Sequence, residues 1–394
     1  MGNSSSITNP FDPTEISIDT KKVSMDTLMR RLQQRTILLS PNFQRNEVWN
    51  EVSKSRLIES LMLNIPIQMF YVAADGKNTW TVVDGLQRIS TFRDFVLGQD
   101  FMKDPENTDK KGHGFRLKGL EFLKNLEGYN LKDIEKKEVG LCNRILETEF
   151  SFTIINPGTH EEVKRNIFKR INTGGDPLQP QEIRNALYAG PAADLLKKLA
   201  DTKYFKDATD GKIPSQRMED QEWILGFLAF LIRPYRNFNR AISMDDWLSE
   251  TMIILNSFVD SNNPDYTRLL AEDKITESLL EKFSYEELEA RFERAIKSQT
   301  ELFEQHAFRT SYGNHRRTPI NRRIFETWGV LLSALTDKEY NNLKAKRHEF
   351  MAAYGDLLES RNFKATLSKH GMDPSAVKKR FSDFSNLLAK YTLK

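Results

Sequence analysis

Residues 79–92, TWTVVDGLQRISTF, place a tight turn between two regular elements. Threonines alternate with large apolar side chains over residues 79–82, which is the two-residue period of a half-buried strand. Apolar side chains then recur at helical spacing over residues 89–96, and that pattern stops before a glycine. Asp84 and Gly85 are therefore predicted to lie at a strand-to-helix junction.

Asp84 has two interpretations at such a junction. As an N-cap, it would accept hydrogen bonds from the first helical turn, while Gly85 would permit a turn that a β-carbon hinders. A cap does not explain Gln87 and Arg88, whose amide and guanidinium groups follow at the same helix end. The four residues together offer an acid or base, hydrogen-bond donors and a positive charge suited to a phosphate. From these residues alone, both interpretations stay open.

Composition limits the class of protein. With 394 residues, 39% hydrophobic and 29% charged, the chain is expected to be globular, with two or three domains. The single cysteine, Cys142, excludes an intrachain disulfide and a cysteine-rich zinc site. The six histidines lack metal-ligand spacing, so no metal site is predicted.

No part of the sequence predicts a membrane protein. An apolar run of about 18 residues is missing, and the N-terminus lacks the basic-then-apolar pattern of a signal peptide. The start, MGNSSS, fits a myristoylation pattern but is interpreted as part of a disordered lead over residues 1–15. The expected location is cytoplasmic, with no membrane partner.

Positive charge is concentrated in one segment. The net charge is only +3, so a nucleic-acid surface would require local clustering. Residues 305–325, QHAFRTSYGNHRRTPINRRIF, contain no acidic residue, whereas solvated charged faces usually mix both signs. Tyr312, His315 and Asn321 lie between the arginines and could add base or sugar contacts. The segment is predicted to bind DNA through five arginines, Arg309, Arg316, Arg317, Arg322 and Arg323.

The first half of the chain predicts a mixture of strands and helices. Ser24 is expected to cap a helix over residues 24–32, and Pro66 to stop a helix that starts at residue 55. The other predicted elements are a strand at 15–19, a hairpin over 67–84 that turns at 75–76, a loop or insertion at 99–115 and a strand at 148–155 that rejoins the sheet. Beyond about residue 191, only helices are predicted, with Ser284 capping one of them.

A break between two helices is predicted within residues 159–190. Thr159 begins a capping box, residues 172–175 interrupt the helix, and Pro180 starts the next one. Free backbone N–H groups at such a break can bind an anion, although a helix hairpin with a glycine C-cap also fits. The entering helix carries three basic residues, Arg165, Lys169 and Arg170.

Three blocks of sequence follow one another along the chain, FQRNEVWNEVSKSRLIESLMLNIPI, TVVDGLQRISTF and FKRINTGGDPLQPQEIRNALY. Together they resemble the N-terminal domain of the GmrSD family of restriction proteins over roughly residues 20–250. The resemblance implies a ParB/sulfiredoxin-like α/β core at 16–190, followed by a helical domain at 191–394, and thus an α+β fold class. Leu86 stands where the family usually has a glutamine. Many relatives add an HNH nuclease domain that is not recognised here, so a standalone member is expected.

Members of this family are associated with nucleotide binding or hydrolysis and with defence against phage DNA, often DNA with modified bases. The resemblance therefore implies a DNA hydrolase that acts on double-stranded phage DNA carrying hydroxymethylated or glucosylated cytosine. An NTP with Mg²⁺ is the cofactor to consider. A partner subunit or a homo-oligomer is the assembly to consider.

Three chemistries stay open for the pocket that the three blocks would build. A nuclease would need Mg²⁺ held by few carboxylates, a DNA glycosylase needs one carboxylate and no metal, and an NTP-gated sensor would need a partner nuclease. The expected catalytic residues are Asp84, Gln87 and Arg88, with Asn172 near Asp84. The expected substrate- or phosphate-binding residues are Phe43, Gln44, Arg45, Trp49, Gly85, Lys169, Arg170, Asn172, Arg184 and Asn185.

Overall fold

The computed structural model describes most of the chain, as two compact units. One unit comprises Met1–Leu178 with Asn185–Leu187, and the other comprises Gln179–Arg184 with Tyr188–Lys394. The domain bounds predicted from the sequence, 16–190 and 191–394, stay a prediction. The described residues are 17–39, 49–74, 79–98, 114–156, 167, 179–188, 190–259, 264–276, 278–368 and 371–392.

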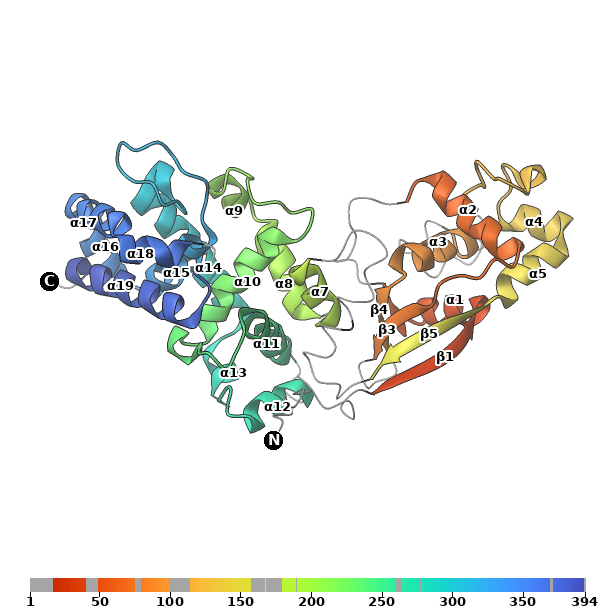
Figure 1. The fold of residues 1–394 in the computed structure, drawn as a ribbon, viewed down its shortest axis with the longest axis horizontal. Helices are drawn as coiled ribbons and strands as arrows, with labels where there is room; N and C mark the ends of the chain where they lie inside the picture. Colours follow the sequence, from red (N-terminus) through yellow and green to blue (C-terminus); the bar gives the residue numbers. More distant parts are fainter. Residues whose placement is uncertain are drawn as a thin grey trace, which may run out of the picture. The chain divides into compact units, whose positions relative to one another are not determined.

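The first unit contains a five-stranded mixed sheet with the strand order β1-β5-β3-β4-β2 (Figure 1). The pairs β1·β5 and β3·β4 are antiparallel, whereas β3·β5 and β2·β4 are parallel. The hairpin and the return of the last strand to the same sheet are confirmed; residues 75–78 of the hairpin lie outside the described residues. The strands are β1 (Ile18–Ser24), β2 (Ile37–Leu38), β3 (Phe70–Ala74), β4 (Trp80–Asp84) and β5 (Glu149–Ile155).

One face of the sheet carries the core. The alternate residues that the period-2 pattern placed inward are buried, and Phe70 is at the centre of an aromatic cluster, stacked on Phe152 at 5.0 Å and edge-on to Phe92 at 6.3 Å. Because Phe92 lies on a helix, this cluster fixes that helix to the sheet. The helices on this face are α1 (Met25–Gln33), α2 (Glu51–Met62), α3 (Leu86–Val96) and α5 (Val139–Glu147) (Figure 1), and α4 (Leu131–Lys137) precedes α5.

Local capping explains where several helices begin. Ser24 caps α1 as predicted, accepting a hydrogen bond from the Thr27 N–H at 3.3 Å. The predicted start of α2 at residue 55 is wrong, because Asn50 accepts from the Ser53 N–H at 2.8 Å and starts the helix at Glu51. The predicted loop at 99–115 lies almost entirely outside the described residues, as does the Thr159 capping box.

Glu59 of α2 is a buried carboxylate that fixes a neighbouring loop. Its two oxygens accept hydrogen bonds from the backbone N–H groups of Glu121 at 3.0 Å, Phe122 at 2.8 Å and Leu123 at 2.7 Å. Burial opposes the charge on Glu59, but these three donors outweigh it and lower the pKa of the carboxyl. The loop thus depends on an ionised Glu59.

Glu59→Gln is expected to lower the free energy of unfolding by about 2 kcal/mol, because an amide group would face backbone donors. The folded-state pKa of Glu59 lies below the unfolded-state value of about 4.3. Its stabilising contribution is therefore complete above that value and is lost as the pH falls through the folded-state pKa. Urea unfolding at pH 7 and at pH 3 measures both effects. Glu121→Gln, at an exposed ion pair with Arg56, is the control and should change little.

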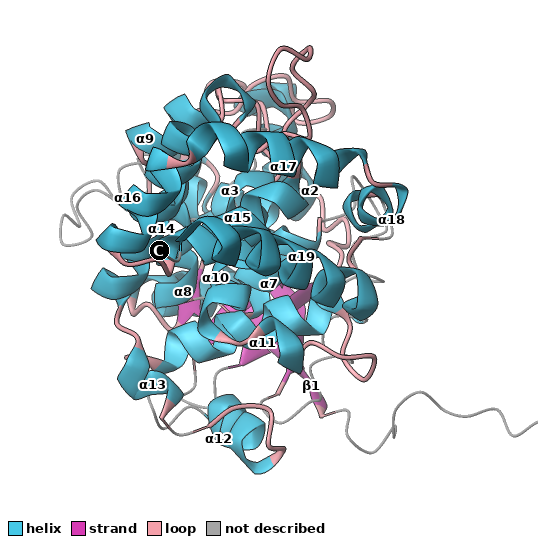
Figure 2. Ribbon diagram, turned by 90° about the vertical axis from the view of Figure 1, so that its left-hand side faces the viewer, coloured by secondary structure: helices cyan, strands magenta, loops and turns pink. Residues whose placement is uncertain are grey.

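Helices are the regular elements of the second unit among the residues that the structure describes, apart from a single β-bridge between Arg309 and Ile320. Ser284 caps its helix as predicted, and Pro180 is the first residue of another. The helix α7 (Pro180–Leu187) belongs to this unit up to Arg184, and its last three residues are assigned to the first unit. The other helices, cyan in Figure 2, are α8 (Pro191–Ala200), α9 (Lys203–Ala208), α10 (Glu219–Ile232), α11 (Met244–Ser257), α12 (Pro264–Ala271), α13 (Leu279–Lys282), α14 (Tyr285–Phe303), α15 (Arg322–Ser333), α16 (Asp337–Ala345), α17 (Arg347–Glu359), α18 (Arg361–Lys364) and α19 (Pro374–Thr392).

The core of the second unit is built around α10. Beyond its acidic first turn, this helix is apolar on all sides and packs against α8, α11 and α15, which is the pattern of a buried helix. Among the described helices of the whole chain, none has both the length and the apolar composition that crossing a bilayer would require.

Candidate functional site

The turn after β4 carries the candidate site. The strand ends at Asp84, Gly85 has a φ of +96°, and α3 begins at Leu86. Gly85, and not Asp84, holds the N-cap position, and no side-chain cap hydrogen bond is formed there. The interpretation of Asp84 as a simple N-cap is therefore not what the structure shows.

Gly85 is required by space as well as by its backbone angle. A β-carbon at this position would meet the ring of Phe70, with Cε1 only 2.7 Å away, and would lie 3.2 Å from Nη2 of Arg88. The left-handed angle is also costly for any residue with a β-carbon. The turn is thus packed directly on the aromatic centre of the core, which fixes the residues on either side of it.

Arg88 is engaged inside the turn. Its Nη2 donates to Oδ2 of Asp84 at 2.8 Å, its Nη1 donates to the carbonyl oxygen of Gln68 at 2.5 Å, and its guanidinium lies 4.5 Å from the centre of the Phe70 ring. Burial lowers the pKa of Arg88, and Asp84 opposes that effect. We therefore revise the sequence-based interpretation: the fork of Arg88 orients Asp84 and ties it to the residues just before β3, rather than pointing at a phosphate.

Asp84 keeps one oxygen for other chemistry. Its side chain is 35% exposed, and Oδ1 makes no hydrogen bond with any residue that the structure describes. The pairing of β3 with β4 shifts register between Tyr71 and Val72, next to the Tyr71–Asp84 pair, and such irregularities often re-aim side chains at functional sites. A carboxylate held through one oxygen can take a proton from water or face a developing positive charge with the other.

The remaining predicted residues of this site are only partly described. Trp49 is 36% exposed immediately before α2, and Gln87 is half-buried in the first turn of α3. The proximity of Asn172 to Asp84 stays a prediction. The predicted residues outside the described part of the chain are Phe43, Gln44, Arg45, Lys169, Arg170 and Asn172.

Arg184 requires a correction. It was expected to bind a phosphate, but its side chain is 1% exposed and belongs to the second unit, where Nη2 donates to Glu222 at 2.7 Å, Nη1 to Asp245 and Nε to Gln181 at 2.9 Å. Burial lowers the pKa of Arg184, and the two acids oppose that effect. Asn185, predicted with it, is also fully buried. Arg184 is therefore a structural ion-pair centre.

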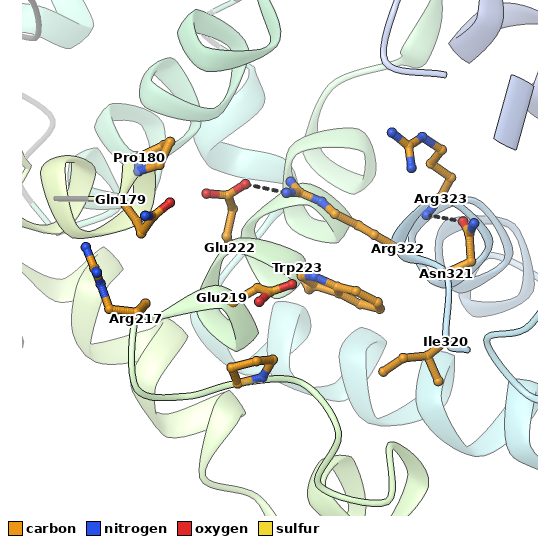
Figure 3. A pocket seen from close by; sticks show the side chains of 11 residues that line it. Gln179, Pro180, Arg217, Glu219, Glu222, Trp223, Ile320, Asn321, Arg322 and Arg323 are labelled. Carbon is orange, nitrogen blue, oxygen red and sulfur yellow. Dashed lines mark hydrogen bonds and ion pairs between the residues drawn. The ribbon is translucent and has the colours of Figure 1, made fainter. Parts of the chain in front are cut away.

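The ion pairs continue from Arg184 toward a pocket of about 690 Å³ in the second unit (Figure 3). Glu222 also pairs with Arg322, and Arg322 donates from Nε to Oε1 of the buried Glu326 at 2.6 Å. Burial opposes the charge on Glu222, but Arg322 and Arg184 outweigh it and lower its pKa. The pocket is lined by Gln179, Pro180, Pro214, Arg217, Glu219, Glu222, Trp223, Ile320, Asn321, Arg322 and Arg323.

The acids of this network were not predicted from the sequence. Glu222 lies in the apolar stretch EWILGFLAF and Glu326 in IFETWGVLL. An acid next to a long apolar stretch of a helix requires a partner when it is buried, since an unpaired buried charge is costly. That signal predicts a basic partner for each acid but does not identify which residue it is.

The arginines of the 305–325 segment fall into two groups. Arg309 and Arg322 are largely buried in ion pairs, so the prediction that they lie on a DNA-binding surface is corrected. Arg316 and Arg317 are exposed, and Arg323 is half-buried. Charge in the sequence could not separate the two groups, because Asp210 and Glu222, which pair with Arg309 and Arg322, lie 99 and 100 residues away in the chain.

In fold and site, the described part of the first unit is an α+β domain whose Asp-Gly-Leu-Gln-Arg turn joins the sheet to a helix. The family model described as GmrSD restriction endonuclease, N-terminal domain, matches residues 27–189, and this part of the chain is a domain of that family, as the resemblance predicted. The match ends at residue 189, short of the residue 250 to which the resemblance was expected to extend. Comparison with curated proteins and with solved structures gave no significant match.

Proposed function

We propose that the chain is a restriction-type, anti-phage defence protein that acts on DNA, and that the Asp84 turn is its reactive site. The observation that carries the proposal is the Asp84–Arg88 pair, held in a fixed turn of a domain whose family is that of a restriction endonuclease.

The proposed reaction is hydrolysis at a DNA nucleotide. In strand cleavage, Asp84 would take a proton from the water that attacks phosphorus, and the 3′ or 5′ oxygen would leave with a proton from solvent. In base excision, the carboxylate would stabilise positive charge on the sugar while water replaces the base at C1′. Arg88 supports either route by keeping Asp84 oriented. The proposed substrate is phage DNA with hydroxymethylated or glucosylated cytosine.

The test uses the full chain with phage DNA containing plain, hydroxymethylated or glucosylated cytosine. Each substrate is incubated with and without NTP and Mg²⁺, and breaks are counted before and after alkali. We expect breaks in the modified substrates. Breaks that appear only after alkali would identify base excision, because alkali cleaves the strand at abasic sites. Breaks that require the NTP would identify gating by the nucleotide. Intact DNA in every arm would refute the proposed enzyme and favour a sensor that needs a partner.

A further inference from the structure

One carboxylate of the second unit is surrounded by an excess of positive charge. Oδ2 of Asp210 lies 2.8 Å from Nη2 of Arg317, 3.2 Å from Nη2 of Arg309 and 3.2 Å from Nζ of Lys212. Arg316 is the next residue to Arg317, is exposed and makes no ion pair within the part of the chain that the structure describes. Three cations thus contact a single acid, Arg316 adjoins them in the sequence, and residues 305–325, which carry the three arginines, contain no acidic residue.

The Asp210 side of this cluster is fixed by its backbone. Asp210 and Gly211, which follow α9, have φ values of +54° and +59°. The N–H of Gly211 donates to the carbonyl oxygen of Lys206 at 2.9 Å, and the N–H of Lys212 to that of Thr209 at 3.0 Å. Aspartate and glycine tolerate this left-handed conformation better than most residues.

The loop that carries Arg316 and Arg317 is held in shape from within. Nδ1 of His306 lies 2.9 Å from Oγ of Ser311, and its Nε2 lies 2.8 Å from the carbonyl oxygen of Gly313. The N–H of Thr318 donates to the same Ser311 hydroxyl at 3.1 Å. The arginines are therefore presented on an ordered loop, which reduces the entropy lost when they bind a partner.

A second contact supports the same loop. The ring of Tyr312 packs against Gly355 of α17, where a β-carbon would overlap it, and the ring of His315 lies 4.5 Å from that of Tyr312. The exposed residues that follow this pair, Arg316 and Arg317, are therefore positioned by the packing of the loop against α17.

The cations differ in access. Arg309 is 4% exposed and also donates to the carbonyl oxygen of Thr318, so it forms the base of the cluster. The side chains of Arg317, Lys212 and Asp210 are 44%, 54% and 40% exposed. Exposed ion pairs of this kind contribute little to stability, and a DNA phosphate offers the same kind of acceptor oxygens to an arginine fork.

We propose that Lys212, Arg316 and Arg317 contact the DNA backbone, with Asp210 occupying the place of a backbone phosphate in the free protein. Arg309 is a positioning residue that holds the loop and the acid together. The inference rests on the proposed function only in taking DNA as the partner. It predicts an unusual result, in which removal of one acidic group strengthens DNA binding.

The test measures binding of a fluorescent, unmodified DNA duplex of random sequence to the full chain at several salt concentrations. Asp210→Asn should raise the affinity about threefold or more at low salt, because one negative charge beside the DNA is removed. The double variant Arg316→Ala/Arg317→Ala should weaken binding and reduce the slope of log K against log salt by about 1.8, or about 0.9 per lost phosphate contact. Asp383→Asn, at an exposed pair with Lys379 on α19, is the matched control and should bind like the wild type.

Three outcomes would overturn the inference: no DNA binding by the wild type, Asp210→Asn binding no tighter than Asp383→Asn, or an unchanged salt slope in the arginine variant. Lys212→Ala, which removes an exposed side chain, covers the case in which Asp210→Asn fails to fold and should lower the slope by about 0.9. Since no cleavage is measured, tighter binding by Asp210→Asn would stand even if the wild type damages no DNA. Conversely, the wild type could damage DNA while the affinity and the salt slope of these variants stay unchanged. That result would be consistent with the proposed function and would contradict the role of the Asp210 cluster in DNA binding.

Discussion

Asp84→Asn is expected to lower the rate of DNA damage by at least about 100-fold, the usual contribution of a carboxylate that moves a proton in the transition state. The amide keeps the shape of the side chain, and its oxygen can still accept from Arg88, so the fold should lose only about 1 kcal/mol. Rates on modified phage DNA and melting curves of the same preparations measure both effects.

Asp133→Asn is the matched control for this variant. Asp133 also pairs with an arginine, Arg116, at 2.8 Å, and its side chain is likewise 35% exposed. It lies in α4 and has no role in the proposed site, so the Asp133→Asn protein should damage DNA at the wild-type rate. A normally folded Asp84→Asn protein with full activity would remove the turn from the mechanism.

The companion change Arg88→Lys separates orientation from charge. An ammonium group keeps the positive charge but cannot bridge Asp84 and the Gln68 carbonyl as the planar fork does. The rate of DNA damage should fall, whereas the free energy of unfolding should change little. Wild-type rates in this variant would show that Asp84 needs no orienting partner.

Arg184→Met is expected to destabilise the second unit by about 3 kcal/mol or more. Removal of one member of a buried ion pair leaves the remaining charges uncompensated, and here Glu222 and Asp245 both lose a partner. Glu222 keeps Arg322, which limits the loss. Unfolding in urea, followed by circular dichroism because this unit is helical, measures the change.

The control for Arg184 is an exposed pair in the same unit. Arg294 lies 2.9 Å from Asp337, whose side chain is 89% exposed, so Arg294→Met should cost less than about 1 kcal/mol. Equal midpoints for the two variants would mean that the network around Arg184 adds nothing to stability.

The parts of the fold that depend on neighbours in the sequence were predictable. Alternation placed Phe150, Phe152 and Ile154 on the buried face of β5, and a hydroxyl before an apolar helix placed the cap at Ser24. These signals act within a few residues. The start of α2 was missed for the same local reason, because Asn50 offered an earlier cap than the apolar pattern suggested.

The arginines show why the rest was not predictable. Arg184 is 38 residues from Glu222 and 61 from Asp245, and Arg322 is 100 residues from Glu222. A basic residue in the sequence looks the same whether it faces solvent or a buried acid, since only the fold supplies the partner. The Asp84 turn was recognisable because strand, glycine and helix follow one another directly, but the inward orientation of Arg88 depends on Phe70 and Gln68.

The position of Arg184 also bears on how such proteins could exchange parts. The family match ends at residue 189 and so includes Arg184, while both acids that pair with it lie beyond that limit. A recombination event that joined residues 27–189 to a different C-terminal half would carry a guanidinium that is buried in this chain without its counter-charges. A successful exchange must therefore bring matching acids in the new half or alter Arg184 at the same time, so the two halves are expected to be inherited together.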